Sequence, residues 1–214
     1  MLSLHRRNTS TRMPVQAFQI PSQPSNLIVA RGRMIEQYLE NLGRFRIGIF
    51  REYPYLYDGD MEYERHYLSR YCSTEHSILL LLNDGQDIAA ACTGLPMKYE
   101  EPAIQAPFQG DCLDLFYIGE IMVRRDCRSM GIGSGLVSRM IRMIDRTRYS
   151  RTCIYTVERP PNHPARPIPY RSPDSLWNSL GFVKSPILKV YYPWKELGED
   201  KETEKPMNVW IKHL

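Results

Sequence analysis

Between residues 123 and 136 the chain reads Val123-Arg-Arg-Asp-Cys-Arg128-Ser-Met-Gly131-Ile-Gly133-Ser-Gly135-Leu136. This stretch joins an apolar segment predicted to be a strand (113–123) to an amphipathic segment predicted to be a helix (131–148). Glycines at a helix start let the backbone approach a ligand closely, and the first N–H groups of a helix have no intrahelical acceptor. Together with the positive end of the helix dipole, these donors favour a phosphate group. The stretch therefore predicts a phosphate-binding turn between a strand and a helix.

The spacing of the glycines separates this turn from two other phosphate-binding turns. A P-loop has Gly-Lys-Ser/Thr at the helix start, whereas here Ser134 follows Gly133. A dinucleotide fingerprint has its glycines directly after the strand, with a small residue where Leu136 stands, and here the loop 124–130 intervenes. Glu158, near the end of a later strand, is a candidate for the ribose-binding acid of that fingerprint. The long loop and its late position in the chain argue against that interpretation.

The remaining pattern, Arg/Gln-x-x-Gly-x-Gly/Ala, is matched at every fixed position by residues 128–133 and resembles the acyl-CoA signature of the GNAT superfamily of N-acetyltransferases. The resemblance covers about residues 26–195. It implies a mixed α/β fold of the α+β type, with a central, mostly antiparallel, twisted sheet flanked by helices. Segments 50–59 and 158–164 are also similar to a bacterial subgroup of that family with undefined substrate.

The resemblance also implies which residues bind the acyl donor, acetyl-CoA. In the family the turn holds the CoA pyrophosphate, and the end of the preceding strand splays to pair with the pantetheine arm. The strand contacts carry over to Met122 and Val123. The phosphate contacts carry over to Arg128, Ser129, Met130, Gly131, Ile132, Gly133, Ser134 and Gly135. The alternative is a glycine-rich helix start that binds nothing.

Periodicity and turn residues predict the other elements. Helices are predicted at 34–50, 61–71 and 174–180, and a β-hairpin at 77–82 and 87–95 around Asn83-Asp84-Gly85. A strand is predicted at 151–157 and two more before Pro193, while 96–110 is not assigned. Residues 1–25 are predicted to be a flexible basic tail and residues 26–214 a single GNAT-like acyltransferase domain.

Composition excludes several classes of protein. The net charge of +4 is carried largely by Arg6, Arg7 and Arg12 in the tail, so we expect no nucleic-acid partner. No apolar run is long enough to span a membrane. The five cysteines have neither zinc-finger spacing nor the pattern of a disulfide scaffold, so we expect no metal. Without a signal peptide, a cytoplasmic protein is expected, with a targeting role for the tail as the alternative; a homodimer is left open.

Acyl transfer to an amine needs a base that removes a proton from nitrogen, and Glu120 is the first candidate. It lies in an otherwise apolar strand, where a carboxylate is costly to bury without a partner. The alternative role for Glu120 is to pair with an arginine and position the strand. Family members often carry a tyrosine that protonates the leaving thiolate, but Trp177 stands at that position. Tyr170 and Tyr155 are the remaining candidate acids, or the thiolate leaves unassisted.

Two loops are rich in side chains that recognise ligands. Tyr55 and Tyr57 lie in loop 51–60, which the resemblance places over the acceptor site. Arg159 and His163 lie in the proline-rich loop 159–171, whose arginines suggest an anionic acceptor or a neighbouring CoA phosphate. The predicted function is transfer of an acetyl group from acetyl-CoA to an amine of a small-molecule or peptidic acceptor. A non-catalytic acyl-CoA-binding sensor is the alternative, and a dinucleotide-binding protein is a distant third.

Overall fold

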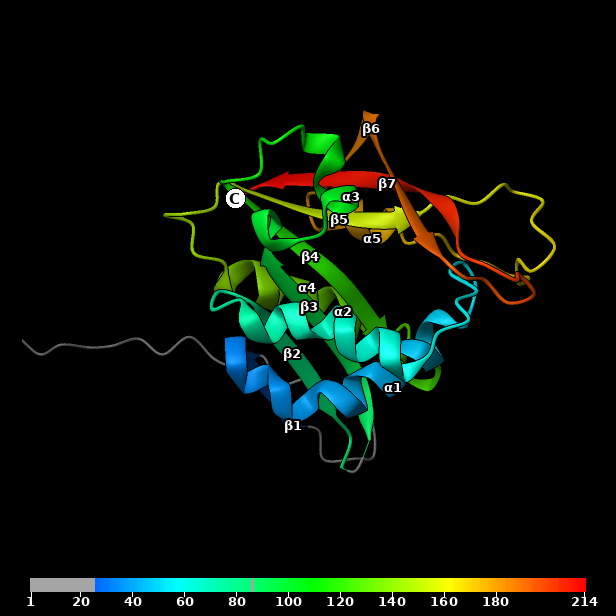
Figure 1. Cartoon of the computed structure of the whole chain (residues 1–214), viewed down its shortest axis with the longest axis horizontal. Coiled ribbons are helices and arrows are strands. Elements are labelled where there is room, and N and C mark those ends of the chain that lie inside the picture. The colour runs from blue at the N-terminus through cyan, green and yellow to red at the C-terminus, as the bar shows by residue number, and fades with distance from the viewer. Residues whose placement is uncertain (1–25, 86) are drawn as a thin grey trace, which may run out of the picture.

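The computed structural model describes residues 26–85 and 87–214, so the predicted tail 1–25 lies outside the described residues. The described strands form one seven-stranded sheet in the order β1-β2-β3-β4-β5-β7-β6 (Figure 1). Every neighbouring pair is antiparallel except β4 and β5. The strands are β1 (Asn26–Arg31), β2 (Ile78–Asn83), β3 (Ile88–Pro96), β4 (Leu115–Val123), β5 (Arg151–Val157), β6 (Val183–Trp194) and β7 (Thr203–His213). This confirms the predicted mixed fold with a mostly antiparallel sheet.

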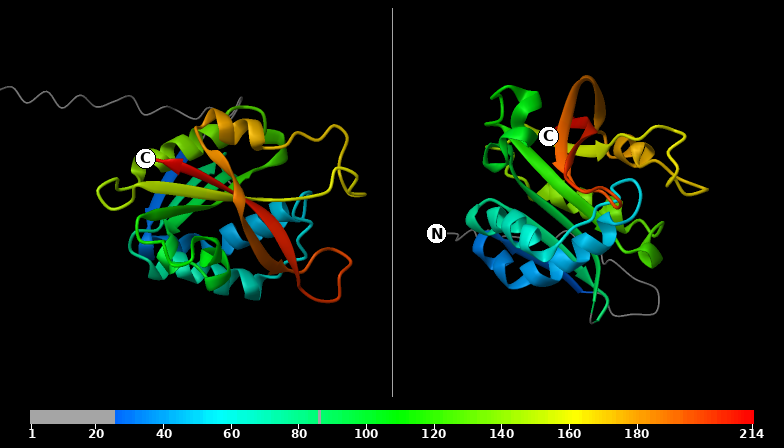
Figure 2. Two further views of the ribbon diagram at one scale, coloured as in Figure 1. Left: turned by 90° about the horizontal axis from the view of Figure 1, so that it is seen from above. Right: turned by 45° about the vertical axis from the view of Figure 1, so that its right-hand side comes forward.

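Helices cover both faces of the sheet, and each face has its own core. One face carries α1 and α2 in blue to cyan, and the opposite face carries α4 and, in orange, α5 (Figures 1 and 2). The helices are α1 (Leu39–Phe50), α2 (Met61–Ser73), α3 (Pro102–Gln105), α4 (Ile132–Met143) and α5 (Asp174–Ser179). Within the described residues, no helix is long and apolar enough to cross a membrane.

Local sequence explains where α2 and α4 begin and end. Asp60 starts α2, because its side chain accepts from the N–H groups of Glu62 and Tyr63. The buried side of α4 is a stripe at helical spacing, as predicted. Its predicted end at 148 is wrong, because the helix stops at Met143. Asp145 then forms a turn in which its carboxylate accepts from the N–H and hydroxyl of Thr147.

Four other segments either differ from their prediction or had none. The strand β1 was not predicted, and the first turns of the expected helix 34–50 form a 3-10 helix from Gly32 to Tyr38. The unassigned segment 96–110 holds two 3-10 turns and α3. Instead of two strands before Pro193, one long strand, β6, is followed by β7. Proline weakens the strand signal in both, but β6 is an edge strand, and Pro206 lies just beyond the pairing of β7 with β5.

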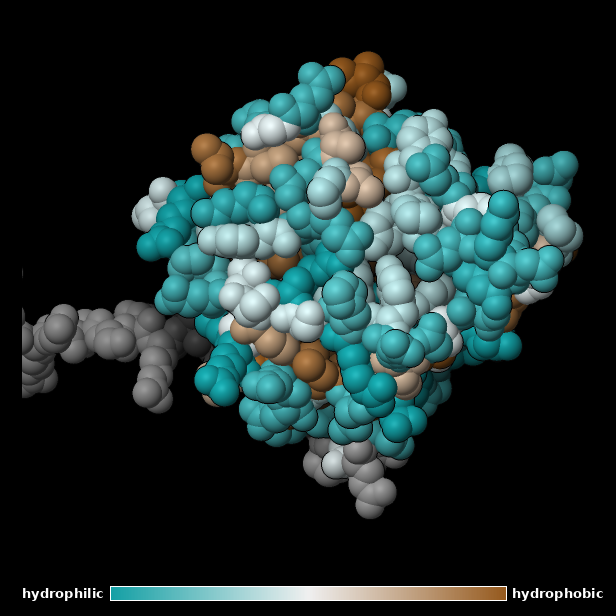
Figure 3. Space-filling model, viewed as in Figure 1, coloured by the Kyte–Doolittle hydropathy of each residue, from teal (hydrophilic) through white to brown (hydrophobic). Residues whose placement is uncertain are grey.

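The edge strand β6 also carries exposed apolar side chains. Ile187 is 83% exposed, between Lys184 and Lys189, where the pairing with β7 is interrupted. Figure 3 shows hydrophobic colour gathered over this end of β6, while the surface over α1 and α2 is mostly hydrophilic.

Two irregularities in β4 shape the centre of the molecule. Its parallel pairing with β5 ends at Tyr117 and Cys153, so the two strands separate beyond that point. Its register with β3 shifts at Gly119, since Thr93 faces Glu120 and Gly94 faces Ile118. Such a bulge inverts the alternation of side chains along a strand. Glu120 therefore lies on the α1–α2 face of the sheet, and the next residue, Ile121, faces α4.

Candidate active site

The start of α4 forms the glycine turn that the sequence predicts. Gly131 has a φ of 76°, in the left-handed region that favours glycine, and precedes the first helical residue. The first helical hydrogen bond runs from the N–H of Gly135 to the carbonyl of Gly131, at 3.0 Å. The N–H groups of Ile132, Gly133 and Ser134 therefore have no acceptor in the preceding turn. This helix start can bind an anion.

Gly133 is not required by the packing of the protein. A Cβ atom there would lie 3.6 Å from Cγ2 of Val123 and 3.9 Å from Cγ2 of Ile121, which are ordinary contact distances. Its φ is not in the left-handed region. The packing around Gly133 would therefore accept a side chain as small as that of alanine.

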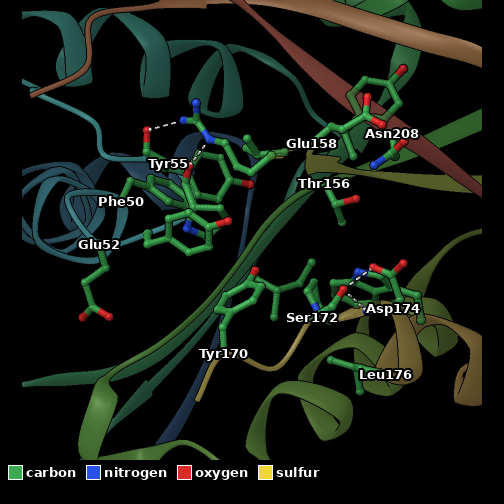
Figure 4. Close-up of a pocket in the computed structure, with 18 of the residues that line it drawn as sticks. Phe50, Glu52, Tyr55, Thr156, Glu158, Tyr170, Ser172, Asp174, Leu176 and Asn208 are labelled. Atoms are coloured by element: carbon green, nitrogen blue, oxygen red, sulfur yellow. Dashed lines mark hydrogen bonds between the residues drawn. The ribbon is translucent and has the colours of Figure 1, made fainter. Parts of the chain in front are cut away.

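A cavity of about 530 Å³ lies where β4 and β5 separate, and we call it the large cavity. Ile121 and Val123 of β4, Val157 of β5 and Gly133 of α4 line it. Figure 4 shows lining side chains from the end of α1 and the loop after it, from the end of β5, from β7 and from residues 170–176. Its labelled lining residues are Phe50, Glu52, Tyr55, Thr156, Glu158, Tyr170, Ser172, Asp174, Leu176 and Asn208.

The predicted donor-binding residues divide between this cavity and the core. Val123, Arg128 and Gly133 line the large cavity. The side chain of Met122 is fully buried on the α1–α2 face, so a contact from it would come from its backbone. Ile132, the first residue of α4, is also buried, in the core between this helix and the sheet. The other predicted turn residues, Ser129, Met130, Gly131, Ser134 and Gly135, surround the helix start.

Arg128 links the turn to the strand and to the loop after α1. Its Nε donates to the carbonyl of Val123 at 2.9 Å, and its Nη1 contacts Oε2 of Glu52 at 2.7 Å. Both partners line the large cavity. The guanidinium thus sits at the mouth of the cavity with one carboxylate beside it.

Glu120 is buried in a network of ionic and hydroxyl groups. The Tyr67 hydroxyl donates to its Oε1 at 2.5 Å, and Arg46 and Thr93 also donate to its carboxylate. Arg46 binds a second carboxylate through Nε, which lies 2.5 Å from Oε2 of Glu64. Burial lowers the pKa of Arg46, but Glu120, Tyr67 and Glu64 outweigh it and raise that pKa well above its usual value. The arginine partner anticipated for Glu120 is therefore Arg46.

A second, small cavity of about 80 Å³ lies on the α1–α2 face. Glu120 and Tyr67 line it, together with aromatic side chains from the loop after α1, from α2 and from β6. Phe50, Tyr55 and Gly119 line both cavities. The two cavities therefore meet at the bulge of β4.

The two candidate phenols occupy different environments. Tyr155 lines the large cavity, but it is buried and its hydroxyl is engaged, donating to the carbonyl of Ile104 at 2.8 Å. Tyr170 lines the large cavity, and Figure 4 shows its side chain directed inward. Burial and the neighbouring Tyr53 raise the pKa of Tyr170, so it is protonated at neutral pH. Trp177 is 5% exposed, and its Nε1 has no hydrogen-bond partner within the described part of the chain.

The predicted acceptor residues are brought together in part. Tyr55 lines both cavities, Tyr57 the small one and Arg159 the large one. The donors of Arg159 are used within the protein: Nε binds the carbonyl of Pro54 at 2.7 Å, and Nη2 binds the carbonyl of Tyr55 and Glu196. His163 lines neither cavity. Its ring packs at 5.6 Å from that of Tyr53, which joins the two loops.

Sequence reasoning missed the partners of Glu120 and the lining role of Ile121. Arg46 comes from α1, Tyr67 from α2 and Thr93 from β3, so only the folded chain brings them together. One signal was available, because tyrosines recur at every fourth position through residues 63–71, on one side of a helix. Ile121 was missed because strict alternation does not anticipate a bulge.

The large cavity thus combines a glycine-bearing helix start with two strands, β4 and β5, that separate. The chain belongs to the acetyltransferase (GNAT) family, whose model matches residues 45–168. No curated protein matches the chain in sequence.

Solved structures show the same fold at low sequence identity. An Acinetobacter baylyi ADP1 protein assigned as an acetyltransferase superposes with a TM-score of 0.58 at 10% identity, covering 92% of this chain and 95% of that one. A ribosomal-protein-alanine N-acetyltransferase from Brucella melitensis gives 0.56 at 12%, covering 87% and 99%. A Salmonella typhimurium protein assigned as an acetyltransferase, solved with acetyl-CoA, gives 0.52 at 10%, covering 89% and 94%.

Proposed function

We propose that this protein transfers the acetyl group of acetyl-CoA to the amine of a small-molecule or peptidic acceptor, with residues 26–214 acting as one domain. The observation that carries the proposal is the meeting of the two cavities at Gly119. A donor in the large cavity and an acceptor in the small one can bring a thioester carbonyl and an amine nitrogen together there. Such positioning supplies much of the rate enhancement of a two-substrate reaction.

In this proposal the large cavity holds the donor. The CoA pyrophosphate binds the free N–H groups at the start of α4, and the pantetheine arm follows β4 beyond Tyr117, where pairing with β5 has ended. Ile121 and Val123 supply the apolar contacts from that strand. The Salmonella typhimurium relative that was solved with acetyl-CoA supports this choice of donor.

The chemistry is a direct transfer that balances without a further reactant. The amine nitrogen attacks the thioester carbonyl carbon, and the C–S bond breaks with its electron pair on sulfur. The nitrogen loses one proton to the oxygen of Tyr67, whose own proton passes along its 2.5 Å hydrogen bond to Glu120. Tyr170 gives a proton to the sulfur, so the products are an amide and the CoA thiol. Proton exchange with solvent then returns Glu120 to its carboxylate form and Tyr170 to its phenol form.

A non-catalytic acyl-CoA sensor is the second candidate function. One observation favours it: both oxygens of Glu120 already accept hydrogen bonds within the protein. For Glu120 to accept a proton, at least one of these donors has to weaken its contact. Turnover separates the two functions, since a sensor binds acetyl-CoA and releases no thiol.

The experiment compares the wild type with Gly133→Ala and a matched control, Gly48→Ala. Both glycines are in helices, and a Cβ at Gly48 meets nothing within 4 Å. A saturating donor stabilises the fold by about 2.7 kcal/mol at a hundredfold excess over Kd, so acetyl-CoA should raise the Tm of the wild type and of Gly48→Ala. Gly133→Ala should keep its Tm without ligand and lose most of that increase.

Thiol release is then followed with a panel of amines. Stabilisation together with turnover establishes the transferase, and stabilisation without turnover on any amine favours the sensor. An equal increase in Tm for Gly133→Ala would show that the helix start does not bind the donor.

A further inference from the structure

We infer that Tyr55 is a catalytic residue of the transfer, whose hydroxyl donates a hydrogen bond to the thioester carbonyl oxygen as negative charge develops there. This inference rests on the proposed function and adds to it a residue that stabilises the transition state. It also changes the role of Tyr55, which the sequence predicts to contact the acceptor.

Tyr55 lies where the two substrates are proposed to meet. Three of the described residues, Phe50, Tyr55 and Gly119, line both the large and the small cavity. Phe50 has an apolar side chain and Gly119 has none, so Tyr55 brings the one polar side-chain group of these three residues to the junction. Figure 4 shows Tyr55 beside Phe50, and the centres of their two rings are 4.5 Å apart.

The hydroxyl of Tyr55 has no hydrogen-bond partner within the described residues. The hydrogen bonds of Tyr55 all run through its backbone. Its hydroxyl oxygen is not among the fully buried polar atoms of the described chain that lack a partner, so it keeps accessible surface. Nearby phenols are already used, since Tyr67 donates to Glu120 and Tyr155 to the carbonyl of Ile104. A donor on a cavity wall that no protein group uses is free for a ligand.

This hydroxyl is a donor that keeps its proton at neutral pH. Burial raises the pKa of Tyr55 well above its usual value, the nearby Glu120 carboxylate raises that pKa further, and Arg46 offsets only part of the increase. A hydrogen bond to an ionised oxygen is roughly twice as strong as one to a neutral oxygen. The contact therefore strengthens as the carbonyl oxygen becomes anionic, and such a gain accelerates the reaction.

The backbone of Tyr55 is fixed before any substrate arrives. Its carbonyl accepts from Nε1 of Trp194 at 3.0 Å and from Nη2 of Arg159 at 3.2 Å, and its N–H donates to the carbonyl of Glu52 at 3.1 Å. The next residue, Leu56, has a φ of 55°, in the left-handed region that leucine rarely adopts. A donor held in place in this way needs no reorganisation when the charge develops, which is how an oxyanion hole acts.

The step balances without a further reactant. The amine nitrogen forms a bond to the carbonyl carbon, and the π electron pair of the C=O bond moves onto oxygen, which accepts the hydrogen bond from Tyr55. The Tyr55 proton stays on its own oxygen throughout. When the electron pair returns to form C=O again, the C–S bond breaks and Tyr170 protonates the sulfur. The two phenols thus act on two different atoms of the thioester.

The test variant is Tyr55→Phe, which removes a hydroxyl that the described residues leave unpaired and keeps the ring. The matched control is Tyr191→Phe, because Tyr191 is 57% exposed on β6 and lines neither the large nor the small cavity. Both variants should keep the Tm of the wild type and its increase with acetyl-CoA. Initial rates are then measured with acetyl-CoA and the amine of the panel that the wild type acetylates fastest.

We expect kcat and kcat/KM of Tyr55→Phe to fall equally, by about a hundredfold, because the lost interaction belongs to the transition state. Tyr191→Phe should retain the wild-type values. An unchanged kcat overturns the inference. A higher KM for the amine at an unchanged kcat also overturns it and returns Tyr55 to the acceptor site. Either result leaves the proposed transfer standing, whereas no turnover of any amine by the wild type would refute the transferase itself.

A second measurement does not depend on the acceptor. A hydrogen bond to a carbonyl lowers its stretching frequency, so infrared difference spectra of bound, isotope-labelled acetyl-CoA report the contact directly. The thioester C=O band should lie at a higher frequency in Tyr55→Phe than in the wild type and in Tyr191→Phe. Identical bands in all three proteins would show that Tyr55 does not contact the carbonyl oxygen and would overturn the inference.

Discussion

The bulge at Gly119 makes a quantitative prediction about stability. A Cβ atom at this position would lie 2.4 Å from the hydroxyl oxygen of Tyr71, well inside contact distance. Tyr71 is 1% exposed, and its ring lies 6.2 Å from that of Tyr67, so it has little room to move. The φ of Gly119 is not in the left-handed region, so Gly119→Ala introduces a clash and no backbone strain. We expect it to lower the free energy of unfolding by about 1–3 kcal/mol, as overpacking does.

A double-mutant cycle isolates the cause. Tyr71→Phe removes the hydroxyl that the new Cβ meets, at the loss of one 3.3 Å hydrogen bond from Thr93. Gly119→Ala should then cost less than about 1 kcal/mol in the Tyr71→Phe background, a coupling of the size expected between residues in contact. Urea denaturation measures all four proteins, with equal m-values required for the comparison. Equal costs of Gly119→Ala in both backgrounds would refute the reasoning.

Three further predictions concern single residues. Hydrogen bonds from Arg151 lower the pKa of Asp114 to about 2. The Asp114 carboxylate therefore stabilises the fold fully at pH values above the pKa of an aspartate in the unfolded chain, and this stabilisation is lost as the pH falls through about 2. Because Asp114 is partly exposed, Asp114→Asn should cost only about 1 kcal/mol at pH 7 and less at pH 2.5 in urea unfolding; a constant cost would contradict this. Arg159→Ala, which breaks a nearly buried pair with Glu196, should lower the free energy of unfolding by about 3 kcal/mol. Glu120→Gln should lower kcat at neutral pH far more than it changes acetyl-CoA affinity, and unchanged turnover would place the base elsewhere.

Much of the fold follows from local patterns. Three features depend only on consecutive residues: the hairpin of β2 and β3, the strand β5 and the buried stripe of α4. The sequence predicted the bounds of each to within a few residues. The strand β1 has only six residues, and their partner, β2, lies about fifty positions further along the chain. The end of β6 and the position of β7 were misjudged because proline weakens a strand signal without regard to whether the strand lies at an edge.

The candidate site divides in the same way. Its glycine turn is contiguous, so residue type and spacing alone predict a helix start with unsatisfied N–H groups. Glu120 was predicted for its chemistry, but its surroundings were not, since Arg46 and Thr93 approach it from other elements. The bulge at Gly119 then determines that Ile121, and not Met122, faces the donor side.

The turn at Gly131 is formed by residues that are adjacent in the sequence, so a few consecutive positions specify it. The small cavity needs α1, α2, β4 and β6 to meet, and the network around Glu120 needs Glu64 and Glu120 to share Arg46. These partners are separated by tens of residues along the chain. A carboxylate needs a partner only when it is buried, and it is buried only once the chain has folded. The sequence by itself therefore predicts the glycine turn proposed to bind the donor. The small cavity proposed for the acceptor is determined by the tertiary structure.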